Sequence, residues 1–390
     1  MERIYMDHHA TTPTLPEVVE EMLPYFTEKF GNPASATHQF GETAAAAVDR
    51  ARSLVAGLIG ANPQEIVFTS GATESNNLAL RGVTRIRKGG GGHIVTSVIE
   101  HQAILETLDE LEQDGIRVTR LGVDRFGRVD PEKVREAIDA ETILVSIQFA
   151  NGEIGTVQPI AEIGRITRER RIPFHTDAVQ AAGRLKIRVV DCGVDLMSLS
   201  AHKMYGPKGI GALYVRKGIR VAPQITGGGQ EGNLRSGTLN VPAIVGFGKA
   251  CEMAREGAEA EAERVSKLRD RLWDSLRRRI TDIRLNGHPD HRLPNNLHCI
   301  FRYVDGEAVV RGADGVALST GSACSTGDHE PSYVIRSLGV ADEECRGSVR
   351  FGLGRSNTDE QVDQVAERIE KAVRRLREIS PLVPEKKPVR

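Results

Sequence analysis

Through the first 215 residues, short segments that are apolar throughout alternate with stretches of helical periodicity. In the stretch 41–59, Ala44, Val48, Ala51 and Val55 recur at steps of three and four, which indicates an amphipathic helix. Segments that are apolar on both faces are typical of parallel strands covered by helices on both sides. The sequence therefore predicts an α/β fold with a mostly parallel sheet. We expect strands at 66–70, 93–98, 116–121, 142–149, 173–177, 194–200 and 210–215, and helices at 41–59, 101–114, 131–139 and 160–171.

The pattern of apolar and charged residues changes after the glycine-rich stretch 227–238. A highly charged helical segment follows at 255–279, and shorter predicted strands and helices continue to a helix near 358–377. With about 150 residues per domain as a guide, 390 residues correspond to two or three domains. We therefore place a boundary near residue 255 and expect a smaller α+β domain after it. Residues 381–390 carry prolines and charges and are expected to form a flexible tail.

The charge balance and the cysteine content exclude several classes of protein. Lys and Arg total 52 against 53 Asp and Glu, so the overall charge gives no basis for binding nucleic acid or an anionic membrane. No apolar run approaches about 18 residues and the N-terminus lacks the apolar part of a signal peptide, so we expect a cytoplasmic protein without a membrane span. The five cysteines form no C-x-x-C pair, which argues against a disulfide framework or a zinc site, and we assign no metal.

Three predicted strands end in loops rich in reactive side chains, and ligands of parallel sheets bind beyond the carboxyl ends of the strands. One loop, SAHKMYGPK, places Lys203 directly after a strand, with Ser200 and His202 beside it. Most lysines lie on the protein surface. A lysine at the mouth of an α/β site also suits a Schiff base, because burial lowers its pKa and frees the amine lone pair. Both interpretations remain open on this segment alone.

The other two loops also carry side chains with two interpretations each. In HTDAVQ, Asp177 ends a strand, where it is either the N-cap of a helix or the partner of a protonated pyridine nitrogen in a pyridoxal site. In the second case Gln180 would reach the phenolic oxygen of the same ring. In SGATESNN, Thr73 and the free N–H groups of a helix start either cap that helix or bind a phosphate.

Two further residues are candidates for catalysis. His101 follows another predicted strand, where a histidine is either a capping or core residue or an acid–base catalyst. Cys324 lies in STGSACSTG, among small residues that give it no apolar surroundings. Such surroundings suit a thiol nucleophile that moves to its substrate, although an ordinary loop cysteine would have them too.

Motifs spread over nearly the whole chain resemble the cysteine desulfurases of the NifS/IscS type, which are pyridoxal-phosphate enzymes of aminotransferase class V. They run from DHHATTP and FGNPAS through FTSGATESNNLA, HTDAVQAAG, SAHKMYGPKGIGALYV and GSACSTG to VRFGLGR. The resemblance implies the type I fold of pyridoxal-phosphate-dependent transferases. In that fold, residues 15–255 would form a large domain on a mostly parallel seven-stranded sheet. Residues 1–14 and 256–380 would form a small domain that carries a mobile cysteine loop.

Carried over residue by residue, the resemblance implies a full set of functional residues. Lys203 would bind pyridoxal 5′-phosphate covalently, Cys324 would accept the sulfur, and His101 would stack on the ring and transfer protons at the substrate thiol. The remaining residues would be Asp177 at the pyridine nitrogen, Gln180 at the phenolic oxygen, Ala72, Thr73, Ser200 and His202 around the cofactor phosphate with Thr238 from the second subunit, and Asn32 and Arg350 at the substrate carboxylate.

The implied reaction takes sulfur from L-cysteine and gives L-alanine and a persulfide on Cys324. The sulfur would pass to an acceptor protein such as an iron–sulfur scaffold, and the enzyme would be a homodimer because Thr238 completes the neighbouring site. Another class V enzyme, such as an aminotransferase or a selenocysteine lyase, would share the lysine and the aspartate but would not need the cysteine. A catalytically idle sulfur carrier with the same fold is the second alternative.

The sequence departs from the family pattern at two places. The family commonly has two asparagines before E-I-G, whereas here Asn151 is followed by Gly152. One hydrogen bond to the phenolic oxygen, worth about 0.5–1.5 kcal/mol, is therefore expected to be lost or replaced by water. The tail after residue 380 lacks the longer segment that housekeeping members use to dock a scaffold, so the resemblance leaves the sulfur acceptor open.

Overall fold

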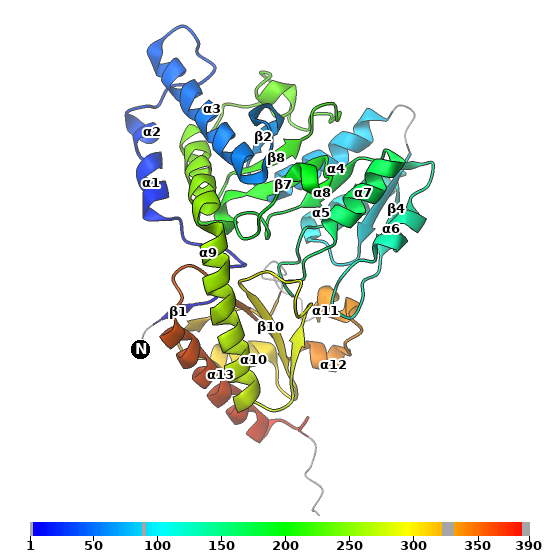
Figure 1. Ribbon diagram of the computed structural model, residues 1–390, viewed down its shortest axis with the longest axis vertical. Coiled ribbons are helices and arrows are strands. Elements are labelled where there is room, and N and C mark those ends of the chain that lie inside the picture. The colour runs from blue at the N-terminus through cyan, green and yellow to red at the C-terminus, as the bar shows by residue number, and fades with distance from the viewer. Residues whose placement is uncertain (1–2, 88–90, 322–330, 384–390) are drawn as a thin grey trace, which may run out of the picture.

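The computed structural model describes residues 3–87, 91–321 and 331–383. Figure 1 shows a larger upper body, coloured blue to green, and a smaller lower body, with α9 (Val241–Arg279) running from one into the other. The N-terminal strand β1 (Ile4–Tyr5) lies in the lower body, paired in parallel with β11 (Val316–Ala317). The beginning of the chain therefore packs with its last third.

A seven-stranded sheet forms the centre of the upper body. Its strands are β2 (Ile66–Thr69), β3 (His93–Ser97), β4 (Arg117–Leu121), β5 (Thr142–Ser146), β6 (Phe174–Asp177), β7 (Leu196–Ser200) and β8 (Gly211–Val215), in the order β2-β8-β7-β6-β5-β3-β4. All neighbours from β7 to β4 pair in parallel, whereas β8 is antiparallel to both β7 and β2. The prediction of an α/β fold with a mostly parallel seven-stranded sheet is confirmed.

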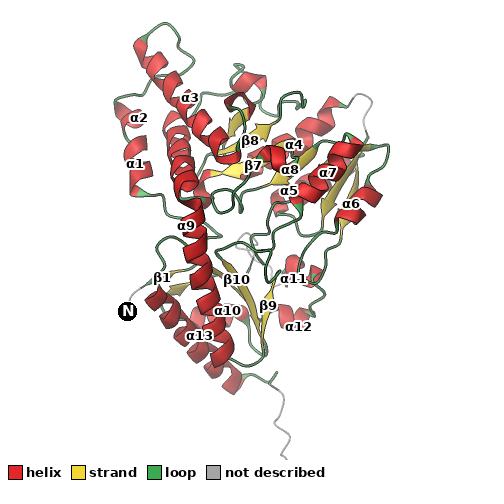
Figure 2. Ribbon diagram, viewed as in Figure 1, coloured by secondary structure: helices red, strands yellow, loops and turns green. Residues whose placement is uncertain are grey.

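Helices cover both faces of this sheet (Figure 2). The helices of the upper body that precede α9 are α1 (Pro16–Met22), α2 (Pro24–Thr27), α3 (Gln39–Ile59), α4 (Ala72–Ile86), α5 (Gln102–Gln113), α6 (Pro131–Ala137), α7 (Ile160–Arg170) and α8 (Val189–Cys192). Neighbouring strand residues enter different hydrophobic clusters, because successive side chains point to opposite faces. Leu196 packs in the cluster of α4 and α5, whereas Met197 packs in that of α3, α7 and the start of α9. This two-sided burial explains why the strand segments are apolar throughout.

The lower body combines a small antiparallel sheet with helices. Its further elements are β9 (Ile283–Asn286), β10 (Asn296–Phe301), α10 (Gly306–Gly312), α11 (Tyr333–Ser337), α12 (Asp342–Cys345), β12 (Ser348–Gly352) and α13 (Asp359–Ile379). The strand order is β12-β10-β9. One face of this sheet, with Cys299 and Phe351, packs against α9 and α13 in a hydrophobic cluster that also contains Met6. The opposite face carries the buried polar residues His298 and Arg350, and also Ile300, which packs with α11 and α12.

The change in the pattern of apolar and charged residues near residue 255 lies inside one continuous helix. Helix α9 begins at Val241, where the side chain of Asn240 accepts a hydrogen bond from the backbone N–H of Ala243. Its first half is apolar because residues such as Phe247 are fully buried in the core of the upper body. Its second half is charged because only a narrow stripe, including Leu272, is buried in the lower body. The pattern therefore marks a change of surroundings rather than a chain break.

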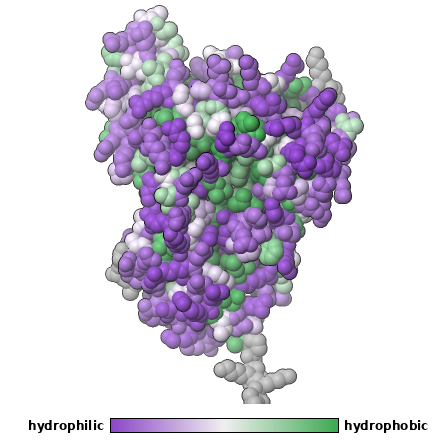
Figure 3. Space-filling view, in the orientation of Figure 1, coloured by the Kyte–Doolittle hydropathy of each residue, from purple (hydrophilic) through white to green (hydrophobic). Residues whose placement is uncertain are grey.

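The outer sides of both bodies are largely hydrophilic, and hydrophobic residues gather on the visible face between them (Figure 3). Among the described residues, no helix is both long and apolar enough to cross a membrane. In the same part of the chain, no group of three or more His, Cys, Asp or Glu side chains is arranged to hold a metal ion.

Candidate active site

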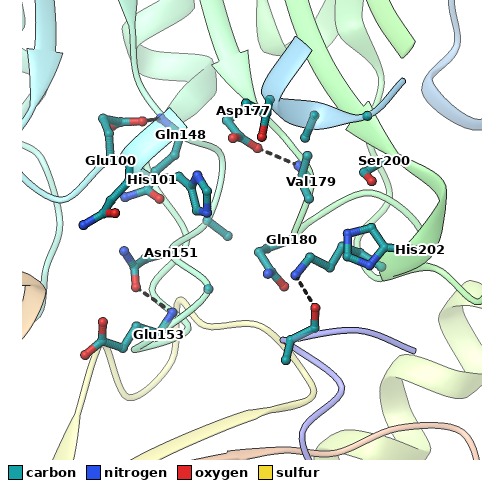
Figure 4. A pocket seen from close by; sticks show the side chains of 18 of the residues that line it. Glu100, His101, Gln148, Asn151, Glu153, Asp177, Val179, Gln180, Ser200 and His202 are labelled. Carbon is teal, nitrogen blue, oxygen red and sulfur yellow. Dashed lines mark hydrogen bonds between the residues drawn. The ribbon is translucent and has the colours of Figure 1, made fainter. Parts of the chain in front are cut away.

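A cavity of about 570 Å³ lies beyond the carboxyl ends of the parallel strands, where the sequence predicted a site (Figure 4). Loops that follow β2, β3, β5, β6 and β7 line it, together with Thr11 of the N-terminal segment and Gly321 and Tyr333 of the lower body. The predicted site residues among its lining are Ala72, Thr73, His101, Asp177, Gln180, Ser200, His202 and Lys203. The fold thus brings together residues from four separate sequence motifs.

Asp177 is held at the end of β6 by two hydrogen bonds. Its Oδ2 atom accepts from the side-chain amide of Asn76 on α4 at 2.8 Å, and its Oδ1 atom accepts from the backbone N–H of Val179 at 3.0 Å. The next helix along the chain, α8, begins only at Val189, so Asp177 does not cap a helix. The structure therefore excludes the N-cap interpretation of Asp177 and shows a carboxylate held in a fixed orientation at the cavity wall.

Lys203 lies in a short 3-10 turn directly after β7 and is half-buried. Its Nζ atom donates hydrogen bonds to the carbonyl oxygens of His9 at 2.6 Å and Ala10 at 2.8 Å. These carbonyls belong to the segment that connects β1 with the upper body. Lys203 is therefore not an ordinary surface lysine, because its amine is turned into the protein and toward the cavity.

The N-terminal end of α4 forms another part of the wall. This helix is 15 residues long, and its first residues, Ala72 and Thr73, line the cavity with the preceding Gly71. Across the cavity floor, burial and the charges of Lys203 and Lys208 lower the pKa of His202 to about 4, so its imidazole is neutral. Free backbone N–H groups and the positive end of a helix dipole attract an anion. The arrangement suits a phosphate group.

His101 caps a helix and also lines the cavity. It is the N-cap of α5, because its Nδ1 atom accepts a hydrogen bond from the backbone N–H of Ala103 at 3.1 Å. An accepting Nδ1 places the proton of the neutral ring on Nε2. The ring also lines the cavity (Figure 4). Capping therefore fixes the position of the ring without using Nε2.

The cavity lining also contains two buried carboxyl groups, Glu100 and Glu153, that were not among the predicted site residues. Burial raises the pKa of Glu100 to about 8, although its carboxyl accepts from Ser97 Oγ at 2.5 Å and from the backbone N–H of Gln148. Burial likewise raises the pKa of Glu153 to about 7. The Glu153 Oε1 atom lies 3.8 Å from Nε2 of His298 on β10. In the sequence Glu100 stands next to His101 and Glu153 next to Gly152, but nothing local signals that they are buried.

Within the described residues, Asn32, Thr238 and Arg350 do not line this cavity. Arg350 lies just behind its wall, where Nη1 donates to the carbonyl of Gly152 at 3.2 Å and Nη2 pairs with Asp7 at 3.1 Å. Asn32 is exposed and borders a second cavity, and Thr238 is exposed after the glycine-rich stretch. The structure therefore does not bring Asn32 to Arg350 within one chain.

Two other sequence-based expectations concern Cys324 and Gly152. Cys324 belongs to the segment 322–330, which lies outside the described residues. At Gly152, a Cβ atom would lie only 2.8 Å from Nε2 of Gln180. The room that an asparagine side chain would need at position 152 is therefore occupied by the amide of Gln180.

Comparisons with known proteins agree with this geometry. Residues 4–365 match the model of the aminotransferase class-V family. A protein of Anaeromyxobacter sp. (strain Fw109-5) named cysteine desulfurase IscS is 54% identical over 381 residues, which cover 97% of this chain and 94% of that protein. A solved structure of a NifS-like protein superimposes with a TM-score of 0.90 at 38% identity, covering 96% of this chain and 100% of that chain.

A second solved structure, described as SspA in complex with cysteine, has a TM-score of 0.81 at 40% identity and covers 90% of this chain and 98% of that chain. The matches span nearly the full length of both partners, and they include both bodies of the fold. The chain therefore belongs to the aminotransferase class-V family, among the cysteine desulfurases of the NifS/IscS type.

Proposed function

We propose that this chain is a pyridoxal-phosphate-dependent cysteine desulfurase, which converts L-cysteine to L-alanine and retains the sulfur as a persulfide on Cys324. The observation that carries the proposal is the meeting of three groups at one cavity: the Lys203 amine, the Asp177 carboxylate and the N-terminal end of α4. The reaction balances in atoms: L-cysteine loses one sulfur atom and becomes L-alanine, and the Cys324 thiol gains that sulfur atom and becomes a persulfide.

The chemistry of the donor set fits pyridoxal phosphate. Asp177 supplies a carboxylate for a protonated pyridine nitrogen, and Asn76 orients that carboxylate. The first turn of α4 with Thr73, Ser200 and His202 supplies hydrogen-bond donors for a phosphate. Lys203 supplies the amine that would hold the cofactor covalently. When bound, this cofactor supplies an electron sink for bond changes at the amino acid.

The chain's own residues have separate tasks in this reaction. The Lys203 amine would act as the base at the cavity, and His101, which lines the same cavity, would exchange a proton with a substrate thiol. Arg350 would receive the substrate carboxylate with its planar pair of N–H groups from behind Gly152. Cys324 would approach the substrate sulfur from the segment that follows Gly321, a residue of the cavity wall.

Several coarser features belong to the same proposal. A homodimer would bring Thr238 of a second copy to the phosphate, which agrees with its exposed position. Residues 15–255 would form one domain, and residues 1–14 with 256–380 the other, in line with the shared cluster of Met6 and Phe351. The sulfur would pass to an acceptor protein, such as an iron–sulfur scaffold. A cytoplasmic location stays a prediction.

The test is to supply the purified protein with pyridoxal phosphate, L-cysteine and a thiol reductant, and to measure alanine and sulfide together. Equal amounts of both products are expected, and the Lys203→Ala variant should yield neither. Supplying L-selenocysteine in parallel distinguishes a selenocysteine lyase, which would turn over that substrate alone. Pyruvate or an amino-group transfer product in place of alanine would contradict the proposal.

A further inference from the structure

His9 and Gln180 are joined by two hydrogen bonds at the wall of the cavity. The His9 Nδ1 atom lies 2.9 Å from Oε1 of Gln180, and the Gln180 Nε2 atom donates to the carbonyl oxygen of His9 at 3.1 Å. The two residues are 171 positions apart in the sequence. His9 is 1% exposed, so this pair is shielded from water. The N-terminal segment therefore closes around the Gln180 side chain.

The partners of the pair determine where the protons are. The His9 carbonyl oxygen can only accept, so it faces the amide nitrogen of Gln180 and leaves Oε1 toward the His9 ring. Arg184, which can only donate, lies with Nη1 at 3.4 Å from the same Oε1 atom. Oε1 is thus an acceptor twice, and the proton of the neutral His9 ring must be on Nδ1. Burial lowers the pKa of His9 well below its usual value, in agreement with a neutral ring.

This arrangement leaves one N–H group of Gln180 for a ligand. An amide nitrogen carries two protons, and one of them goes to the His9 carbonyl. Gln180 lines the cavity, where its second N–H group is available. The amide is also packed over Gly152, because a Cβ atom there would lie 2.8 Å from Nε2. Ring, carbonyl and glycine together hold the amide in one place.

The same residue, His9, also contacts Lys203. Its carbonyl oxygen accepts from the Lys203 Nζ atom at 2.6 Å, so one peptide group serves both Lys203 and Gln180. We propose that His9 is a positioning residue, which aims the free N–H group of Gln180 at the phenolic oxygen of the bound cofactor in the room left by Gly152. This inference rests on the proposed function and adds how a chain without the second asparagine keeps a donor at that oxygen.

The proposal predicts a change in the visible absorption of the cofactor-loaded protein, not only in its activity. A hydrogen bond to the phenolic oxygen stabilises the negative charge on that oxygen. The oxygen then attracts the proton on the nitrogen joined to Lys203 less strongly. Without the donor, that proton is held more tightly, so the pH midpoint of the visible band rises. One hydrogen bond of about 0.5–1.5 kcal/mol corresponds to a rise of about 0.4–1 pH unit.

The experiment titrates the visible band of the loaded wild type and of five variants with pH. His9→Leu removes the ring donor to Gln180. Gly152→Ala displaces the Gln180 amide and leaves the His9 side chain unsubstituted. The test therefore stands even if one variant does not fold. Both are expected to raise the midpoint. The double variant is expected to show the shift of one single variant, because both act through Gln180. His9→Asn keeps a donor near the position of Nδ1 and is expected to restore the wild-type midpoint.

His8→Leu is the matched control, since the His8 ring contacts the carbonyl of Gly352 at 2.9 Å instead of Gln180. It is expected to lower thermal stability and leave the midpoint unchanged. An unchanged midpoint in both His9→Leu and Gly152→Ala, additive shifts in the double variant, or an equal shift in His8→Leu would overturn the role of His9. If the wild type acquires no visible band with pyridoxal phosphate, it is the proposed function that fails.

Discussion

Asn76 donates a hydrogen bond from its side-chain amide to Oδ2 of Asp177 at 2.8 Å, across 101 positions of sequence. Asn76 is fully buried on α4, and Asp177 ends β6. The helix whose first turn forms the proposed phosphate site therefore also orients the carboxylate at the other end of the cavity. The two ends of the site are coupled through one helix.

Replacing Asn76 by alanine is expected to lower kcat because Oδ2 of the Asp177 carboxylate loses its orienting donor and only the Val179 N–H to Oδ1 remains. Leaving such a group unsatisfied costs about 1–3 kcal/mol, which corresponds to a loss of about 5- to 150-fold. Steady-state kinetics with L-cysteine measures the effect. Asn77→Ala on the same helix is the control, since Asn77 donates to Thr73 O instead. Equal losses in both variants would refute the orienting role of Asn76.

Arg350→Lys is expected to raise KM for L-cysteine, with a smaller effect on kcat. A lysine cannot bind a carboxylate with two parallel N–H groups, and a hydrogen bond to a charged group contributes about 1.5–3 kcal/mol, or about 10- to 150-fold in affinity. Arg346→Lys, at an exposed position of the same chain segment, is the control. A KM unchanged by Arg350→Lys would exclude Arg350 from carboxylate binding.

Glu100 predicts a specific dependence of stability on pH. Burial raises its pKa from 4.5 to about 8, so the native protein keeps a proton that the unfolded chain releases. Stability that is fully present below pH 4.5 is lost as the pH rises toward 8, by up to about 1.4 kcal/mol per pH unit.

The neutral variant Glu100→Gln does not carry this pH-dependent loss. Its melting temperature, relative to that of the wild type, is expected to rise between about pH 5 and pH 8. Glu106→Gln, on the exposed side of α5, is the control and is expected to follow the wild type. A constant difference between Glu100→Gln and the wild type over this range would show that Glu100 is ionised throughout.

Cys324→Ser separates sulfur transfer from cofactor binding. The variant is expected to keep the visible band and to bind L-cysteine, yet to form no alanine and carry no persulfide, because a hydroxyl does not accept the sulfur. Mass spectrometry of the intact protein after incubation with L-cysteine detects the persulfide. Cys192→Ser is the control, since Cys192 is not among the residues that line the cavity. Normal turnover by Cys324→Ser would refute its assignment as the acceptor.

Much of the fold and of the site was predictable from local sequence. Continuous apolar segments indicate strands buried on both faces, and the loops after them carry Asp177, His101 and Lys203, which the structure brings to one cavity. These predictions succeed because the carboxyl ends of parallel strands meet at the same edge of a sheet. Neither the strand segments nor the motifs required knowledge of distant contacts.

The parts that the sequence did not reveal depend on contacts between distant segments. The pairing of His9 with Gln180 spans 171 positions, and the burial of Glu100 and Glu153 depends on elements that fold around them. The domain boundary near residue 255 stays a prediction; that residue lies inside α9, whose first half packs in one hydrophobic cluster and whose second half packs in another, and a change in composition cannot distinguish this arrangement from a linker. Local patterns indicate the secondary-structure elements and where they end, but they do not indicate which distant segments of the chain pack against them.

Lys203 is proposed to bind pyridoxal phosphate covalently, and borohydride reduction of the loaded protein shows which lysine forms that bond. Reduction makes the linkage permanent, so peptide mass spectrometry locates the modified lysine. Lys208 provides an internal control, because it lines the same cavity but lies outside the turn that follows β7. The phosphopyridoxyl group is expected on Lys203 alone. Its appearance on Lys208 instead, or on no lysine of the cavity, would refute covalent binding by Lys203.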